Sequence, residues 1–196
     1  ERDYDRILFA TPTRRMADKT QVFPLERNDS VRNRLTHSYE VSSLARSIGT
    51  RLAFDHGQSI FAGCDQMTVI RCVPALLSAI GLVHDLGNPP FGHQGEAAIQ
   101  SWFRHNKQMV FNGNDNLAQD FVHFDGNAQT FRLVTKLQVL NDSFGLNLTY
   151  ATLASMLKYP VANQDLAATG WKKHGFFASE AGIVTDIWQE TGLGPG

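Results

Sequence analysis

Apolar side chains recur every three or four residues along most of the chain, which is the spacing of an amphipathic helix. The clearest such face predicts a helix from about Arg32 to Ala53 and is marked by Leu35, Val41, Leu44, Ala45, Ile48 and Leu52. Alternating patterns typical of half-buried strands are few, and neither internal repeats nor low-complexity segments are visible. The pattern therefore predicts a mainly α fold.

A second predicted helix is marked by side chains at intervals of four, three and four: Val73, Leu77, Ile80 and His84. Pro74 is expected in the first turn of this helix, where a missing N–H does no harm. Pro89 and Pro90 should end it, because a residue before proline avoids helical angles. This places His84 on the buried stripe of the helix, with Asp85 one step around it.

The remaining pattern divides into further helices and one loop. A third helix is predicted from near Gly95, and helical spacing resumes over Thr130–Leu140 and Tyr150–Leu157. The Asn-rich segment 104–120 is predicted as a loop that extends to about residue 126. We expect residues 1–196 to form a single domain, because their number suits one hydrophobic core.

Composition narrows the class of protein without identifying it. An apolar fraction of 42% and a charged fraction of 19% are those of an ordinary globular chain, which argues against disorder. The net charge is −1, and the mildly basic N-terminal quarter is compatible with an anionic ligand. Cys64 and Cys72 are too few for a disulfide framework. The apolar stretches look too short and interrupted to span a bilayer and no signal peptide is visible, so we expect a cytoplasmic protein with no membrane partner.

Candidate chemistry gathers in "GLVHDLGNPPFGHQGE", residues 81–96, where His84, Asp85, His93 and Glu96 surround a proline turn. His37, early in the first predicted helix, is a possible partner for the His-Asp pair. Imidazole nitrogen and carboxylate oxygen together suit a divalent transition ion or Mg²⁺, with positions left open for water and substrate. The alternative is that each histidine is a buried residue with an ordinary hydrogen-bond partner, and a His-Asp dipeptide alone does not separate the two.

Ordered sequence blocks point to a family. "KTQVFPLE", "RLTHSYEV", "HDLGNPPFGHQGEAAI", "HFDGNAQTFRLV" and "LNLTYATLASMLKYP" follow one another along the chain. Together they closely resemble the HD-superfamily deoxynucleotide triphosphohydrolases, in particular the bacterial deoxyguanosine triphosphate triphosphohydrolases. The resemblance runs from "RILFATPTRRMADKTQVF" to "KKHGFFASEAG" and implies an HD-type helical bundle.

The resemblance also implies an activity and a set of site residues. His37, His84 and Asp85 match metal ligands of the family, which would hold one divalent ion such as Mg²⁺ or Mn²⁺. The family hydrolyses dGTP, and in some members other dNTPs, at the α-phosphate to deoxynucleoside and tripolyphosphate. His93 matches the proton-transfer residue, and Glu96 would orient and charge-stabilise its imidazole. Glu96 can also be read as a helix-start carboxylate favoured by the helix dipole.

Substrate-binding positions follow from the same resemblance. Gln21 matches a residue lying against the deoxyribose, and Lys158 and Tyr159 match residues of the nucleotide pocket. Arg34, one helical turn before the predicted ligand on the first helix, could meet a phosphate oxygen or could equally be a surface arginine. Asn127 could face the pocket or serve a turn.

The chain departs from the family at the fourth metal ligand, an aspartate in a later "ADDI" segment that residues 1–196 lack. We therefore expect an N-terminal portion of an HD bundle, truncated before the C-terminal helices and inactive alone, with the fourth ligand beyond Gly196. The family further implies a homo-oligomer, a hexamer in relatives, and a single-stranded DNA or nucleotide effector. The alternatives are another HD-superfamily phosphohydrolase or phosphodiesterase, or a non-catalytic nucleotide-binding regulatory fragment.

Overall fold

The computed structural model describes residues 1–23, 28, 30–138 and 144–194. Over these ranges the chain is helical and contains no strand, so the prediction of a mainly α fold is confirmed. Short 3₁₀ segments and one π turn, Leu133–Leu137, connect some of the helices. In chain order the α-helices are α1 (Arg2–Phe9), α2 (Thr11–Arg15), α3 (Arg34–Asp55), α4 (Gly57–Ile60), α5 (Gln66–Val83), α6 (Gly92–His105), α7 (Lys107–Phe111), α8 (Asp115–Val122), α9 (Gly126–Arg132), α10 (Tyr150–Met156), α11 (Leu166–Thr169) and α12 (Ala181–Thr191).

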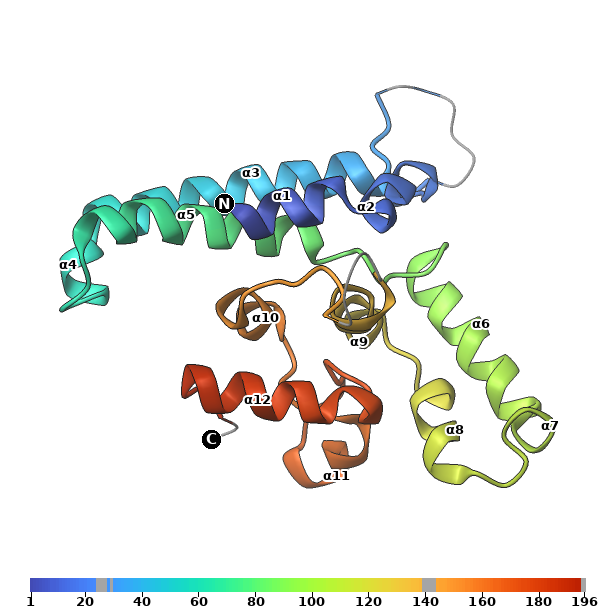
Figure 1. Cartoon of the computed structure of the whole chain (residues 1–196). Helices are drawn as coiled ribbons and strands as arrows, with labels where there is room; N and C mark the ends of the chain where they lie inside the picture. Colours follow the sequence, from blue (N-terminus) through green and yellow to red (C-terminus); the bar gives the residue numbers. More distant parts are fainter. Residues whose placement is uncertain (24–27, 29, 139–143, 195–196) are drawn as a thin grey trace.

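The two longest helices, α3 and α5, lie antiparallel along one layer, and α1 lies beside α5 (Figure 1). The α3 helix begins at Arg34, where the side chain of Asn33 accepts a hydrogen bond from the Thr36 amide. The two backbones approach closely: a Cβ on Gly81 would lie 2.7 Å from Ser42 Cα, and one on Gly49 would lie 2.8 Å from Pro74 Cα. Close approach of this kind requires small side chains.

The face of α3 that packs against α5 is therefore not the predicted one. Besides Arg34, its buried residues are small: Ser38, Ser42, Gly49 and Ala53. Leu44 is 66% exposed and Ile48 is 59% exposed. The apolar spacing located the helix within two residues of its observed bounds. It identified the buried face only in part: Leu35 packs against the core, but the residues at the contact with α5 are selected by the interhelical distance and not by hydrophobicity.

Helix α5 starts earlier than predicted. Asp65 caps it by accepting hydrogen bonds from the Thr68 amide at 2.8 Å and from the Thr68 hydroxyl at 2.7 Å. Pro74 consequently lies inside the helix and not in its first turn. The fully buried residues of α5 are Ala79, Leu82 and Val83, whereas the predicted stripe ending at His84 is only partly buried.

An expectation about membranes is also corrected by α5. With a mean hydropathy of 1.6 over 18 residues, this helix is long and apolar enough to cross a bilayer by length and composition alone. The core helix of a soluble protein passes the same test, and α5 packs against α1, α3 and α10. Its length therefore does not indicate a membrane span.

The segment predicted as a loop over 104–126 contains two helices, α7 and α8. Its polar residues form turns and caps: Asn112 and Gly113 take positive φ angles of 46° and 84°, and the Asn114 side chain accepts from the Leu117 amide to start α8. Aromatic rings pack between α6, α7 and α8 with centroids 4.9 to 5.8 Å apart, contributed by Phe103, Phe111 and Phe121. Local composition suggested a loop, whereas aromatic packing makes the segment helical.

Other boundaries agree more closely with the prediction. Helix α6 begins at Gly92 instead of near Gly95, and α10 ends one residue before the predicted Leu157. The predicted helix over 130–140 corresponds to the end of α9 and the π turn, and its last residues, 139 and 140, lie outside the described residues. The helices α1, α2, α4, α11 and α12 are additional to the predicted ones.

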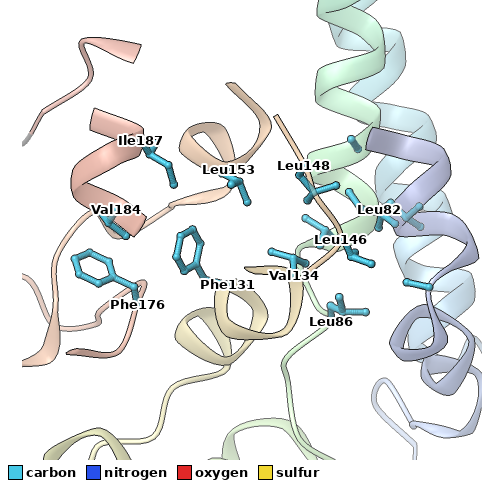
Figure 2. Close-up of a cluster of buried hydrophobic side chains, with 14 of the residues drawn as sticks. Leu82, Leu86, Phe131, Val134, Leu146, Leu148, Leu153, Phe176, Val184 and Ile187 are labelled. Carbon is cyan, nitrogen blue, oxygen red and sulfur yellow. The ribbon is translucent and has the colours of Figure 1, made fainter. Parts of the chain in front are cut away.

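A hydrophobic core joins α5 to the layer formed by α9, α10 and α12 (Figure 2). Leu82 on α5 and Leu86 in the turn after it belong to the same cluster as Leu146 and Leu148, while Phe131 lies between α9 and α12. Asp3, on α1, ties this layer to the first one, accepting from the Thr149 amide at 2.9 Å and from the hydroxyls of Thr149 and Thr152 at 2.6 Å. Burial raises the pKa of Asp3, but these hydrogen bonds outweigh it and hold the pKa below its usual value.

Candidate metal centre and substrate cavities

The turn after α5 carries the His-Asp pair and is anchored to α9. Helix α5 ends at Val83, so His84 is the C-cap and Asp85 begins the turn. Gly87 donates its amide to Thr130 Oγ1 at 2.8 Å, and a Cβ at this position would lie 2.2 Å from the Thr130 nitrogen. Only glycine allows this approach, which fixes where the His-Asp pair lies relative to α9.

His37, His84 and Asp85 come together where α3 meets the end of α5. One ligand atom from each lies within 4.8 Å of the others, and the two imidazole centroids are 5.3 Å apart. His84 Nδ1 lies 2.8 Å from the Gly81 carbonyl oxygen, which favours a proton on Nδ1 and a free lone pair on Nε2. Metal-bound histidines characteristically donate their second ring nitrogen in this way. The cluster therefore fits a divalent ion.

His37 is suited to its place in this cluster by its protonation. Burial, together with the neighbouring charge of His84, lowers the pKa of His37 below its usual value. A histidine must be neutral to donate a lone pair to a metal, and a lowered pKa keeps the neutral form populated at neutral pH.

Arg34 lies beneath the cluster and is not a surface arginine, since only 3% of it is exposed. Its Nη1 donates to Asp85 Oδ2 at 2.8 Å, while Asn88 Nδ2 donates to Asp85 Oδ1 at 2.6 Å. Lys19 donates to the Asn88 carbonyl at 3.0 Å, a contact that the sequence did not suggest. The bonds from Arg34 and Asn88 orient the Asp85 carboxylate. Arg34 Nε is buried without a hydrogen-bond partner in the described part of the chain.

His93 and Glu96, at the start of α6, are in direct contact. His93 Nδ1 lies 2.7 Å from Glu96 Oε2, and Glu96 Oε1 accepts from the Gly126 amide at 2.9 Å. The Glu96 side chain is 11% exposed and that of His93 is 83% exposed. Glu96 is the fifth residue of α6, so an interaction with the helix dipole does not account for these contacts.

Two cavities meet beside these residues and share Asp85, Asn88, His93 and Glu96. The first has a volume of about 590 Å³, and its other lining residues are Thr20, Gln21, Val22, Arg34, Phe91, Gly92 and Gln94. Gln21, the predicted sugar-binding residue, thus lines this cavity. Its side-chain oxygen Oε1 is buried without a hydrogen-bond partner among the described residues.

The second cavity, of about 660 Å³, contains the other predicted substrate residues, Asn127, Lys158 and Tyr159. Asn127 serves a turn as well, since its backbone and side-chain amides both donate to Asp125 Oδ1, at 2.8 and 2.7 Å. Lys158 Nζ lies 5.3 Å from the centroid of the Tyr159 ring. Opposite them, the wall is apolar and comes from α3 and α5 through Val41, Ala45, Leu77 and Ile80.

Sequence reasoning missed several residues of this region. Lys173 lines the second cavity and adds a cation to it, and Phe91 lines the first. Both stand in stretches already noted, "KKHGFFASEAG" and "NPPFGH", but neither has a partner at helical spacing that would mark it. Among the described residues, no further acid joins His37, His84 and Asp85 in the cluster.

Comparisons with known proteins show which sequences this chain is similar to. A family model for the HD domain matches residues 34–122, which include His37, His84 and Asp85 and the His93–Glu96 pair. A protein of Listeria monocytogenes named deoxyguanosinetriphosphate triphosphohydrolase-like is 41% identical over 201 residues, which cover 97% of this chain and 43% of that protein.

Two other proteins with the same name show similar sequence identity and coverage. The Synechocystis protein is 42% identical over 205 residues, covering 98% of this chain and 46% of its own length. The Pseudomonas aeruginosa protein is 39% identical over 196 residues, covering 98% and 43%. The chain therefore spans less than half the length of these relatives.

Proposed function

We propose that this chain, as an HD-domain member of the deoxyguanosinetriphosphate triphosphohydrolase-like proteins, forms the metal-binding part of a hydrolase. The hydrolase would cleave dGTP, and other dNTPs, to deoxynucleoside and tripolyphosphate. The observation that carries the proposal is the junction of the two cavities, which Asp85 of the three-residue cluster lines together with the His93–Glu96 pair. Such a junction brings a metal, a proton donor or acceptor, and room for substrate to one point.

The metal would be held by His37, His84 and Asp85. A divalent ion at this position supplies Lewis acidity toward a phosphoryl oxygen. The protein side chains prepare the site for it: the Gly81 carbonyl selects the tautomer of His84, and Arg34 and Asn88 orient the carboxylate of Asp85. Either Mg²⁺ or Mn²⁺ is compatible with this mixed set of nitrogen and oxygen ligands.

His93 is the proposed proton-transfer residue. Because Nδ1 faces Glu96, the exposed Nε2 is the nitrogen free to exchange a proton with water or with the leaving oxygen. Glu96 holds the ring in this orientation and stabilises its protonated form, as a carboxylate does in other histidine-based catalytic pairs.

Substrate recognition is divided between the cavities. Gln21 would lie against the deoxyribose in the first, and Arg34, which lines the same cavity, would meet a phosphate oxygen. Lys158 and Lys173 in the second cavity suit the negative charge of a triphosphate, and the ring of Tyr159 can pack on the nucleoside.

The whole protein's remaining properties are proposals of the same kind. We propose that an acidic ligand from outside the 196 residues completes the metal site, so that residues 1–196 alone are inactive. A cytoplasmic homo-oligomer, with single-stranded DNA or a nucleotide as effector, is our expectation from the family resemblance.

Product analysis tests the proposal against its two alternatives. The full-length protein is incubated with dGTP and Mn²⁺ or Mg²⁺, and the products are identified by ³¹P NMR. Tripolyphosphate with deoxyguanosine supports the proposed activity. Orthophosphate would indicate a different HD-superfamily phosphohydrolase, and binding without turnover would indicate a regulatory nucleotide-binding protein.

A further inference from the structure

Phe91 has an unusual backbone conformation for a bulky residue. It precedes α6 with φ 65° and ψ 17°, in the left-handed region. The other described non-glycine residues with positive φ are Asn112 and Asn147, and asparagine tolerates this region far better than phenylalanine does. This conformation lowers the stability of the folded protein, and glycine or asparagine at this position would adopt it with less strain.

The hydrogen bonds of the turn account for the backbone conformation of Phe91 but not for its aromatic side chain. The Phe91 carbonyl accepts from the amides of Gln94 and Gly95, and a Cβ on Gly95 would lie 2.1 Å from the Pro90 carbonyl oxygen. This tight turn brings His93 and Glu96 toward the cluster of His37, His84 and Asp85. Nothing in it requires an aromatic side chain: Phe91 is 66% exposed, and its ring has no aromatic partner among the described residues.

The ring instead borders the first cavity. Phe91 and Val22, which is 70% exposed, are the large apolar residues of a lining that is otherwise polar or glycine. Two residues of the same lining, Gln21 and Arg34, each carry a buried polar atom without a hydrogen-bond partner among the described residues, Oε1 as an acceptor and Nε as a donor. A ligand that satisfies this lining has a flat apolar face, a hydrogen-bond donor and an anionic oxygen.

A nucleoside bearing a phosphate has all three of these features. We propose that Phe91 is a substrate-binding residue whose ring packs against the nucleoside part of the nucleotide in the first cavity, next to the proton-transfer pair. This inference rests on the proposed function and assigns a nucleoside contact to a residue within the metal-site turn. Strain at Phe91 is then retained because the ring contributes to binding.

Two substitutions separate the ring from the backbone. Phe91→Asn suits the left-handed conformation and removes the ring, whereas Phe91→Tyr keeps the ring. In the full-length protein, kcat/KM for dGTP should fall by about tenfold to a hundredfold in Phe91→Asn, the range for losing one aromatic stacking contact with a base, and stay near wild type in Phe91→Tyr. Phe9→Asn is the matched control, because Phe9 is also 66% exposed but borders neither cavity; it should leave kcat/KM unchanged.

Further readouts distinguish substrate binding from a structural role. The melting temperature of Phe91→Asn should equal or exceed that of wild type, because the strain is relieved. Inhibition by inorganic tripolyphosphate, which has no nucleoside, should be unchanged. Three results would each overturn the inference. They are an unchanged kcat/KM in Phe91→Asn, a melting temperature lowered by several degrees, and inhibition by tripolyphosphate weakened by the same factor as kcat/KM.

The same set distinguishes failure of the inference from failure of the proposed function. Absence of dGTP turnover in the wild-type protein would contradict the proposed function itself. In that case deoxyguanosine binding to wild type and to Phe91→Asn is compared by calorimetry. Weaker binding by the variant supports the nucleoside contact, whereas equal affinity or no binding to either overturns it.

Discussion

Replacing Glu96 by glutamine perturbs the proton-transfer pair with little change in shape. In the native site Oε1 accepts from the Gly126 amide at 2.9 Å and Oε2 faces His93 Nδ1 at 2.7 Å. The Gly126 amide can only donate, so in Glu96→Gln the side-chain oxygen faces Gly126 and the NH₂ group faces His93. An NH₂ donor favours the tautomer with an unprotonated Nδ1, which places the proton on Nε2 and also removes the negative charge that stabilises the imidazolium.

The magnitude follows from these two bonds. Turnover should fall by about a hundredfold to ten-thousandfold, the range for losing a general acid or base or holding it in the wrong tautomer. Stability should change by only about 1–2 kcal/mol, because two charge-assisted hydrogen bonds become neutral ones. Glu96→Ala is a poorer probe, since it leaves the buried Gly126 N–H without an acceptor, at a further cost of about 1–3 kcal/mol.

The assay compares steady-state dGTP turnover, metal content and thermal unfolding of full-length wild type, Glu96→Gln, His93→Ala and the double variant. We expect full metal content throughout, and a double variant that loses much less than the product of the single losses, as for residues acting as a unit. Turnover of Glu96→Gln within a few-fold of wild type, or losses that multiply, would refute the reasoning. Loss of metal from His93→Ala would make His93 a ligand instead.

Three other predictions address the metal, the sugar and the fold. His84→Ala should abolish both metal binding, measured by elemental analysis, and dGTP turnover, while the helical circular-dichroism signal persists; near-normal turnover would contradict the ligand assignment. Gln21→Ala should narrow the ratio of kcat/KM for dGTP over GTP, because a close contact with the sugar edge excludes an added hydroxyl; an unchanged ratio would remove Gln21 from the sugar site. Asp3→Asn should lower the free energy of unfolding at neutral pH by about 1–2 kcal/mol, since the Asp3 carboxylate accepts hydrogen bonds from Thr149 and Thr152 at the start of α10. The folded-state pKa of Asp3 is lowered, so this stabilisation is present above its unfolded pKa of about 3.9 and is lost as pH falls through the folded value; denaturant titrations that show the same difference at pH 3 and pH 7 would contradict it.

The sequence predicted the helices better than the way they pack. Spacing located α3 and α10, because each carries a local apolar pattern and each starts at a capping residue, Asn33 and Thr149. It could not predict that α3 meets α5 through Ser42 and Gly49, since that face depends on how closely two distant segments approach. For the same reason the start of α5 was misplaced: Pro74 suggested a first turn, but Asp65 starts the helix.

The sequence likewise marked some residues of the candidate site and not others. His84, Asp85, His93 and Glu96 could be identified together because they share sixteen consecutive residues, and the structure gathers them with His37. Lys19 and Lys173 approach the site only through tertiary contacts, so no local pattern marks them. Arg34 shows the limit most clearly: its position one turn before His37 was evident, but its burial and its ion pair with Asp85 were not.

Isotope labelling tests the central claim, that water attacks the α-phosphorus at the cluster of His37, His84 and Asp85. The full-length protein is supplied with Mn²⁺ or Mg²⁺ and turns over dGTP in H₂¹⁸O, and both products are analysed by mass spectrometry. The account predicts one ¹⁸O atom in tripolyphosphate, none in deoxyguanosine, and no reaction after chelation or in Asp85→Asn. Label in the 5′-hydroxyl of deoxyguanosine, release of orthophosphate or pyrophosphate in place of tripolyphosphate, or metal-independent turnover would contradict it.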